Sequence, residues 1–437
     1  MRRNILFAAI VVVVCLGLVL VKCAFSSERT TGSDAFPVEN ARMCGLNEVL
    51  KNADSDSLDT KTMERYILRW MDRNEMRGAS LAIMKNEKLI YCKGFGWADE
   101  EEQRRAEAGD IYRMASASKL ITAVGIMKLV DDGKLGLDSC VFGPEGILKQ
   151  FTHLGDKRIK KITVRHLLNH TSGFSNRRCD AMFHIDKIIK WEQLDHVPTA
   201  DEIIQFQLDQ HLRDNPGGSP LYSNVGYLML SRVIEEVSGQ RYEEYIQESI
   251  LRPIGCIDMH IGKNYYEERF PNEVRYYPST PGDMVECYDG SKEMKPRQYG
   301  GNDVTGLQGA GGWVASTAEL ARLVAAIDGR PGVPDILTKR SIKEMRTIRR
   351  KGDYALGWAR YSQKAGCLYR TGTMSGTCAY IESCNNGWTY VFLTNTSHYM
   401  GPGFTLSIGS MVRTAVRSVK KWPSDRNLFD KAMPDHD

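Results

Sequence analysis

The chain has 437 residues, of which 26% are charged and 42% hydrophobic, and its formal net charge at pH 7 is +4. A chain of this length and composition can bury a large globular core. The net charge is small for the length, and no basic stripe is interleaved with aromatic residues, so the sequence does not favour a nucleic-acid partner.

An apolar segment lies at the N-terminus. Arg2 and Arg3 precede an apolar run over residues 5–21, which is close to the lower length limit for crossing a bilayer. Because positive residues stay on the cytoplasmic side, we expect residues 1–23 to anchor a single-pass type II membrane protein whose remaining chain is extracellular or lumenal. A cleaved signal peptide is the alternative, and it would leave a secreted protein.

A serine and a lysine one helical turn apart follow a predicted β-hairpin over residues 78–97. Ser116 and Lys119 open an apolar helix that we expect to end at Gly133. At this spacing the lysine amine can reach the serine hydroxyl, which needs a base before it can act as a nucleophile. A second Ser-x-x-Lys, over residues 418–421, lies in a polar and basic stretch and is interpreted as solvated surface.

A second apolar helix is predicted over residues 224–237. Tyr222 and Asn224 precede it, and they favour a proton relay and a substrate-binding amide if they lie near Ser116. Taken alone, the same residues are typical of a helix cap. Residues 263–305 are polar and rich in Tyr, Pro, Gly and Asp, which predicts a long excursion over the surface.

The last third of the chain is predicted to contain a capping box at residues 316–319, which opens another helix, and then strands between residues 357 and 394. With strands near both ends and helices between them, the fold class is α+β, with the two ends meeting in one sheet. Residues 370–373 lie on one of these strands, where a glycine permits close approach of another backbone. We expect the N–H groups of Thr373 and Ser116 to form an oxyanion hole, and Arg370 to bind a substrate carboxylate. Taken alone, this is an ordinary strand with one surface arginine.

Nine of the eleven cysteines lie beyond residue 23, and none forms a Cys-x-x-Cys pair, so no metal site is expected. Disulfide bonds are expected in an oxidising compartment, although their pairing is open. Asn395 and Asn169 each begin a glycosylation sequon, and Asn395, at the end of a predicted strand, is the better candidate.

Three motifs in this order resemble the serine β-lactamase and penicillin-binding-protein family, and most closely its branch of class C β-lactamases, DD-carboxypeptidases, esterases and animal lactamase-like proteins. The motifs of that family are Ser-x-x-Lys, Tyr-x-Asn and a Lys/His-x-Gly strand. They correspond here to Ser116/Lys119, Tyr222/Asn224 and Arg370/Gly372. The resemblance spans roughly residues 60–415. It implies an antiparallel sheet flanked by helices, with an inserted all-helical lobe.

The resemblance also implies a mechanism that needs no cofactor. Ser116 would attack the carbonyl of a small-molecule or peptide acyl donor and form an acyl-enzyme, with Lys119 and Tyr222 transferring the proton. Catalytic residues are therefore Ser116, Lys119 and Tyr222. Substrate-binding and oxyanion residues are Asn224, Arg370, Thr371, Gly372 and Thr373.

The strand motif departs from the family at its first position. Arg370 keeps the positive charge of the usual Lys or His, but it cannot transfer a proton. The sequence therefore predicts a serine hydrolase for an amide, peptide or ester. The alternative is an inactive family member that serves as a membrane-tethered binding or assembly protein. The predicted division is an anchor or signal segment (1–23), a polar stalk (24–55), the β-lactamase-like domain (56–417) and a polar C-terminal tail (418–437).

Overall fold

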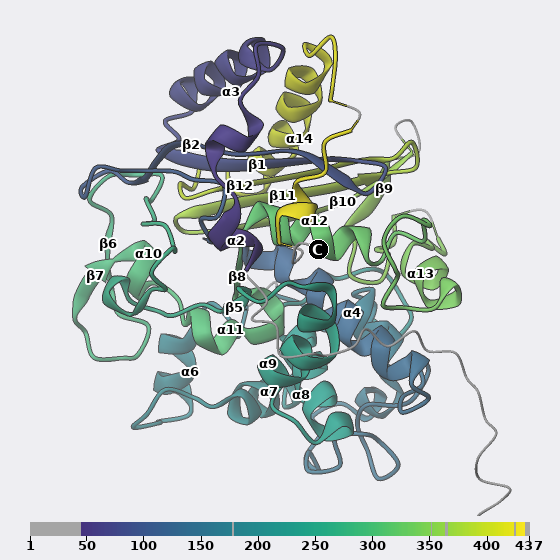
Figure 1. Ribbon diagram of the computed structural model, residues 1–437. Coiled ribbons are helices and arrows are strands. Elements are labelled where there is room, and N and C mark those ends of the chain that lie inside the picture. The colour runs from purple at the N-terminus through teal and green to yellow at the C-terminus, as the bar shows by residue number, and fades with distance from the viewer. Residues whose placement is uncertain (1–44, 177–178, 351, 363–365, 424, 433–437) are drawn as a thin grey trace, which may run out of the picture. The chain divides into compact units, whose positions relative to one another are not determined.

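The centre of the structure is a seven-stranded antiparallel sheet in the order β3-β2-β1-β12-β11-β10-β9 (Figure 1). This computed structural model describes residues 45–176, 179–350, 352–362, 366–423 and 425–432. The strands are β1 (Gly78–Lys85), β2 (Lys88–Asp99), β3 (Arg104–Arg105), β9 (Arg360–Ser362), β10 (Cys367–Met374), β11 (Thr377–Cys384) and β12 (Trp388–Thr394).

The two ends of the fold meet in the middle of this sheet, as the sequence predicts. Strand β1 pairs with β12 in a register that sets Ala79 opposite Thr394. The hairpin of β1 and β2 is also observed. Gly357 and Trp358, in contrast, were expected to begin a strand and lie in a loop before β9. Gly357 has φ +82°, and a Cβ there would lie 2.5 Å from the Cβ of Ala123, so the chain bends against the helix beneath it.

Helices cover both faces of the sheet (Figure 1). On one face, α3 (Lys61–Arg73) and α14 (Pro402–Arg417) pack Ile67 and Ile408 against Phe392 of the sheet. Below the other face lie α12 (Thr317–Ala325) and the helical lobe. The remaining helices are α2 (Leu46–Val49), α4 (Ser118–Asp131), α5 (Val164–Leu168), α6 (Ile185–Trp191), α7 (Ala200–Leu208), α8 (Val225–Ser238), α9 (Tyr242–Ile246), α10 (Arg297–Gly300), α11 (Val304–Gly311) and α13 (Lys339–Met345).

Two small sheets connect these layers. One joins β4 (Tyr112–Arg113), β8 (Trp313–Ala315) and β5 (His260–Ile261), and the other is the hairpin of β6 (Met284–Glu286) and β7 (Met294–Pro296). The hairpin and α10 belong to the excursion predicted over residues 263–305, which is therefore partly ordered secondary structure. A buried ion pair between Arg113 and Glu273 holds this excursion against β4.

The folded core extends to segments that the sequence describes as polar. Leu46 and Leu50, within residues 24–55, are buried, as are Leu428 and Phe429 in the turn η7 (Leu428–Ala432). Burial of these side chains removes apolar surface from water, so both segments stabilise the fold. The boundaries placed at residues 23, 55 and 417 stay a prediction.

The expected membrane location is corrected. Within the described part of the chain, no helix is both long and apolar enough to cross a bilayer. The prediction of a type II single-pass membrane protein is therefore wrong on this finding, and association with a membrane is not supported. The segment on which it depended, residues 1–23, lies outside the described residues.

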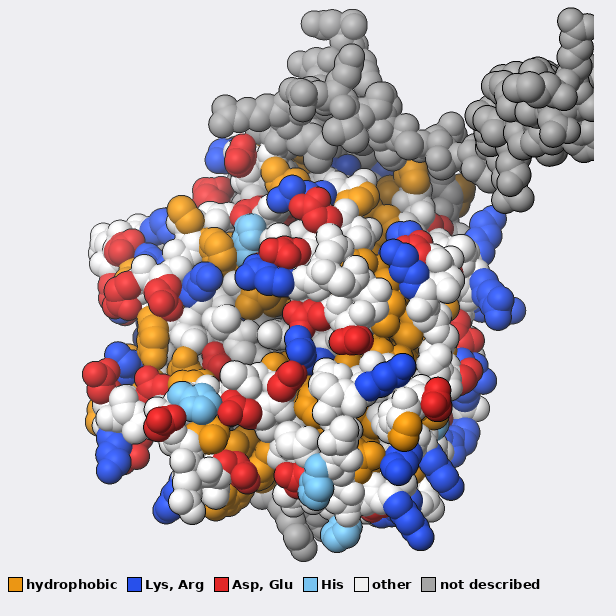
Figure 2. Space-filling view, turned by 90° about the horizontal axis from the view of Figure 1, so that it is seen from below, with side chains coloured by type: hydrophobic (Ala, Val, Ile, Leu, Met, Phe, Trp, Pro, Cys, Tyr) orange, Lys and Arg blue, Asp and Glu red, His pale blue; other side chains and the backbone are white. Residues whose placement is uncertain are grey.

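A disulfide joins two neighbouring strands of the main sheet. It links Cys367, the first residue of β10, to Cys384, the last residue of β11. Glu382 lies beside them, but sulfurs joined to each other are not available to a metal. On the face shown in Figure 2, acidic and basic side chains are intermixed over much of the surface, a pattern that does not attract a polyanion.

Candidate active site

Ser116 lies in a strained turn at the head of the central helix. It occupies the 3₁₀ turn η2 (Ala115–Ala117), immediately before α4. Ala115 has φ +45°, a left-handed conformation that costs about 1–2 kcal/mol for a residue with a side chain. Strain of this kind is retained where the surrounding structure requires it, often at a functional site.

Two proton-bearing side chains meet the Ser116 hydroxyl. The Lys119 Nζ lies 3.2 Å from Ser116 Oγ, and the Tyr222 hydroxyl donates to the same oxygen at 2.8 Å. Tyr222 comes from the loop before α8, over a hundred residues away in sequence. The fold therefore brings together the three residues that the sequence proposed as catalytic.

Lys119 is fully buried, and its amine is held by protein acceptors. Its Nζ donates to Asn224 Oδ1 at 2.8 Å and to the Ala310 carbonyl. Burial, assisted by the positive charge of Arg370, lowers the pKa of Lys119 to about 8. At this pKa the protonated form still predominates at pH 7, but part of the amine is neutral and can act as a general base.

Tyr222 is held between two cations. Burial acts to raise the pKa of Tyr222, but the charges of Lys119 and Arg370 and the hydrogen bond to Ser116 outweigh it, so the net pKa is lowered. The Arg370 Nη2 donates to the Tyr222 hydroxyl at 3.3 Å. The Tyr222 ring packs on the ring of His170, with a centroid distance of 4.4 Å. Tyr222 is thus prepared to release and regain a proton.

Strand β10 approaches the nucleophile turn closely at Gly372. A Cβ at this position would lie 2.1 Å from the Met114 carbonyl oxygen and 3.0 Å from the Ser116 nitrogen. Only glycine permits this approach. Strand β9 pairs with β10 only as far as Tyr369, and among the described residues no strand pairs with this edge of β10 beyond it. Because alternate residues face such an edge, the N–H of Thr373 points outward there, on the same side as that of Thr371.

Arg370 is 1% exposed, and its guanidinium group makes hydrogen bonds within the protein. Its Nε donates to the Ser116 carbonyl at 2.8 Å, and its Nη2 to Tyr222. The sequence suggested a fork onto a substrate carboxylate, but two of the three guanidinium nitrogens already have partners. Asn224 contacts Lys119 through its Oδ1, and its Nδ2 donates to Asp180 at 2.6 Å. Its role toward a substrate stays a prediction.

Three further groups at the site were not predicted as functional from the sequence. Asp180 accepts from both Asn224 and Asn176, and burial raises its pKa. His170 is buried, its Nδ1 accepts from the Ser223 N–H, and burial and the nearby cations hold its pKa well below the usual range. It is therefore neutral. The third group is the carbonyl of Ala310, which only the fold brings to Lys119.

The two glycosylation candidates are both engaged by the fold. Asn395 is buried, and its Nδ2 donates to the Trp97 and Ala98 carbonyls, so the amide that a glycan needs is occupied by the fold. Asn169 is half-buried, and its Oδ1 accepts from Thr171.

An antiparallel sheet flanked by helices, with a serine and a buried lysine between its layers, is the arrangement of a serine hydrolase fold. A model of the β-lactamase family matches residues 63–407, and the chain belongs to this family. The resemblance and the fold class expected from the sequence are confirmed.

Relatives and solved structures agree with this family. The chain is 25% identical over 396 residues to the putative penicillin-binding protein PbpX of Bacillus subtilis, covering 90% of this chain and 89% of that protein. The octameric penicillin-binding protein homologue from Pyrococcus abyssi superposes with a TM-score of 0.63 at 26% identity, covering 84% and 80% of the two chains. D-amino acid amidase from Ochrobactrum anthropi shares the fold, with a TM-score of 0.64 at 22% identity and coverage of 84% and 100%.

Proposed function

We propose that the protein hydrolyses an amide, peptide or ester acyl donor through an acyl-enzyme on Ser116. The observation that carries this proposal is the contact of one hydroxyl with two groups that can move its proton. These groups are Lys119, fully buried with a pKa of about 8, and Tyr222, whose pKa is lowered.

Acylation begins when Lys119 takes the proton of Ser116, directly or through Tyr222. The Ser116 oxygen then bonds to the substrate carbonyl carbon, whose oxygen gains negative charge and accepts from the N–H groups of Ser116 and Thr373. Tyr222 gives a proton to the leaving amine or alcohol as the carbon–heteroatom bond breaks, and Lys119 returns a proton to Tyr222.

Deacylation reverses these roles. A water molecule enters where the leaving group was, and Tyr222 or Lys119 takes its proton as its oxygen attacks the ester carbon. The Ser116 oxygen then leaves and recovers its proton. Arg370 stays charged throughout, so its two hydrogen bonds stabilise the turn and favour the deprotonated form of Tyr222. The solved D-amino acid amidase, a relative in fold, supports an amide as one class of acyl donor.

Covalent labelling tests the proposal. A fluorophosphonate probe is expected to add to Ser116 in the wild-type chain, and mass spectrometry of the labelled peptide locates the adduct. Ser116→Ala abolishes the label, whereas Ser118→Ala, at the first residue of α4, keeps it. If the folded wild-type chain forms no Ser116 adduct, and Ser116→Ala keeps the binding or assembly role of the wild-type chain, an inactive family member is favoured.

A further inference from the structure

A buried carboxylate with one unpaired oxygen lies beside the disulfide of the main sheet. Glu382 is 1% exposed, and its Oε1 accepts from Arg413 Nη1 of α14 at 2.7 Å. Its Oε2 is also buried, and no group in the described part of the chain donates a hydrogen bond to it. Because an unpaired buried oxygen costs free energy, its presence in a folded chain points to a ligand or a change of state at this place.

Strand pairing places this carboxylate on the same face of the sheet as the two sulfurs. Cys367 lies opposite Cys384, and Tyr369 lies opposite Glu382. Since residues two apart on a strand share a face, Cys367, Glu382 and Cys384 project together toward α14. A carboxylate oxygen and the two sulfurs all lie within 4.8 Å of one another. Among the residues that the structure describes, no other group of three His, Cys, Asp or Glu side chains meets this condition.

These distances suit a tetrahedral zinc ion once the two sulfurs are released from each other. Zinc binds thiolate sulfur at about 2.3 Å and carboxylate oxygen at about 2.0–2.2 Å, so its ligand atoms lie roughly 3.6–3.8 Å apart. The carboxylate therefore needs to approach the sulfurs by no more than about 1 Å. Rotation of the two cysteine side chains about their Cα–Cβ bonds can bring the sulfurs to the same spacing while the strands stay paired. Water completes the four ligands.

The charges around the disulfide also favour a divalent cation in the reduced form. With the disulfide intact, the charge of Glu382 is balanced by Arg413. Arg330, which donates to the Cys384 carbonyl, is paired with Asp328. Two thiolates add two negative charges, and a zinc ion adds two positive ones, so the cluster with Glu382 and Arg413 sums to zero. Thiolate ligands select zinc over magnesium and calcium, which prefer oxygen.

The reduced form of this pair is accessible to the chain. The described residues include six free cysteines, of which four are buried, so the fold accommodates many reduced thiols. A disulfide is rarely retained in a reducing compartment. Cys384 ends its strand immediately before the exposed Asn385, which leaves the pair close to the surface for a small reductant or a metal ion.

We propose that reduction of the Cys367–Cys384 disulfide opens a zinc site formed by the two thiolates and the Glu382 carboxylate. A dithiol supplies two electrons and two protons: it closes to its own disulfide as the Cys367–Cys384 bond breaks and two thiols form. Zinc then replaces the two thiol protons, which are released to solvent. Coordination thus takes over from the covalent bond in holding β10 to β11. The sequence shows no Cys-x-x-Cys pair here because the two cysteines come from different strands, 17 residues apart.

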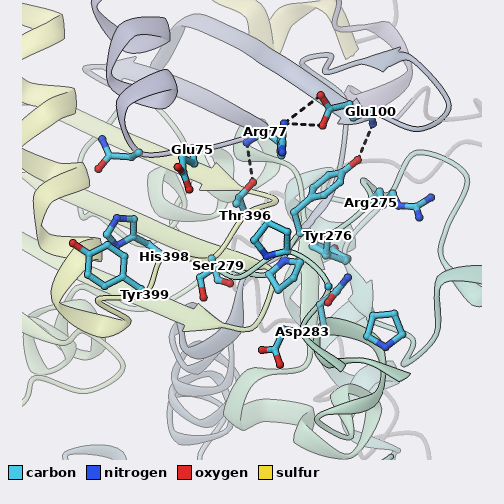
Figure 3. Close-up of a pocket in the computed structure, with 18 of the residues that line it drawn as sticks. Glu75, Arg77, Glu100, Arg275, Tyr276, Ser279, Asp283, Thr396, His398 and Tyr399 are labelled. Atoms are coloured by element: carbon cyan, nitrogen blue, oxygen red, sulfur yellow. Dashed lines mark hydrogen bonds and ion pairs between the residues drawn. The ribbon is translucent and has the colours of Figure 1, made fainter. Parts of the chain in front are cut away.

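A cavity elsewhere on the molecule supplies a control for adventitious zinc binding (Figure 3). It has a volume of about 490 Å³, and its lining includes Glu75, Asp283 and His398, which are side-chain types that bind zinc. Their ligand atoms do not form one of the close groups found among the described residues. We therefore expect His398→Ala to leave the zinc affinity of the reduced chain unchanged.

Metal titration of the full chain tests the site. The chain is reduced with a water-soluble phosphine, separated from it without oxygen and titrated with Co²⁺, whose thiolate complexes absorb in the near ultraviolet. This band is expected in the reduced chain and not in the oxidised chain, and one equivalent of zinc should abolish it. Replacing Cys367 and Cys384 together by serine should remove the band. Replacing Cys140 and Cys179 together by serine, two free thiols that are not buried, is the matched control and should keep it.

Glu382→Gln tests the carboxylate. We expect the zinc affinity of the reduced chain, measured by competition with a chromogenic chelator, to fall at least about tenfold. Circular dichroism checks that the variant is folded, and the comparison of oxidised and reduced wild-type chains decides on the thiolates without any variant. The proposal is overturned if the reduced wild-type chain shows no band, if the band survives in the Cys367→Ser/Cys384→Ser chain, or if a folded Glu382→Gln chain binds zinc as tightly as the wild type.

Discussion

The contact between β10 and the nucleophile turn makes Gly372→Ala the sharpest test of the site. The added Cβ would lie 2.1 Å from the Met114 carbonyl oxygen, whereas Cβ atoms in proteins essentially never come closer than 3.0 Å to such an atom. The strand and the turn must therefore separate by about 1 Å. That movement carries the Thr373 N–H away from the place where the oxyanion is proposed to form.

The magnitude follows from the geometry. A displacement of about 1 Å costs on the order of 100-fold in rate, similar to the loss of one oxyanion-hole donor. We expect kcat/KM for a p-nitrophenyl ester to fall by 100-fold or more, which corresponds to about 2.7 kcal/mol of transition-state stabilisation. The rate constant for fluorophosphonate labelling should fall with it, because the probe uses the same oxyanion donors.

A matched glycine separates this effect from misfolding. Gly403 lies in α14 with nothing within 4 Å of its ideal Cβ, so Gly403→Ala should leave both rates unchanged. Circular dichroism and a thermal melt check that each variant is folded. A folded Gly372→Ala chain that labels and turns over at the wild-type rate refutes the oxyanion geometry described for Ser116 and Thr373.

Three further outcomes are expected. Lys119 acts as a base only when it is neutral, and its pKa is about 8. We therefore expect kcat/KM to rise about tenfold per pH unit below this value and to level off above it. A flat pH profile contradicts the role of Lys119 as the base. Asp180→Asn removes a negative charge that favours the protonated form of Lys119, so the rising limb should move toward lower pH, and a movement to higher pH would refute the arrangement. Replacing Cys367 and Cys384 together by alanine removes a cross-link between residues 17 apart in sequence. The free energy of unfolding in urea should fall by about 3 kcal/mol, while labelling of Ser116 is retained. An unchanged unfolding midpoint would show that this cross-link does not stabilise the fold.

Those parts of the fold that depend on local patterns were predictable. The β1–β2 hairpin follows from two short apolar runs with a polar turn, and α8 follows from its helical apolar spacing. The end of α4 at Gly133, which has φ +70°, follows from the preference of a helix end for glycine. The periodicity predicted one buried face for α4, however, and nearly all of its side chains are buried, because the helix lies between the sheet and the helical lobe.

The candidate site was predictable only where its residues fall in motifs. Ser116, Lys119 and Tyr222 were identified by order and spacing. Asp180 was not, because it lies in an irregular stretch and its partner Asn224 is far along the chain. The hydrogen-bond partners of Arg370 could not be predicted from the sequence either, because its acceptors are the Ser116 carbonyl and the Tyr222 hydroxyl, which come from distant segments. Contacts of this kind depend on tertiary packing rather than on local propensity.

The pairing of β1 with β12 has a consequence for biosynthesis. At typical translation speeds, roughly 15 to 60 s pass between the emergence of these two strands from the ribosome. During that interval the early hairpin exposes a long apolar edge that has no neighbour, a form that readily joins other nascent chains. Recombinant yield should therefore depend on holding chaperones and on slow expression at low temperature more than on the stability of the finished protein.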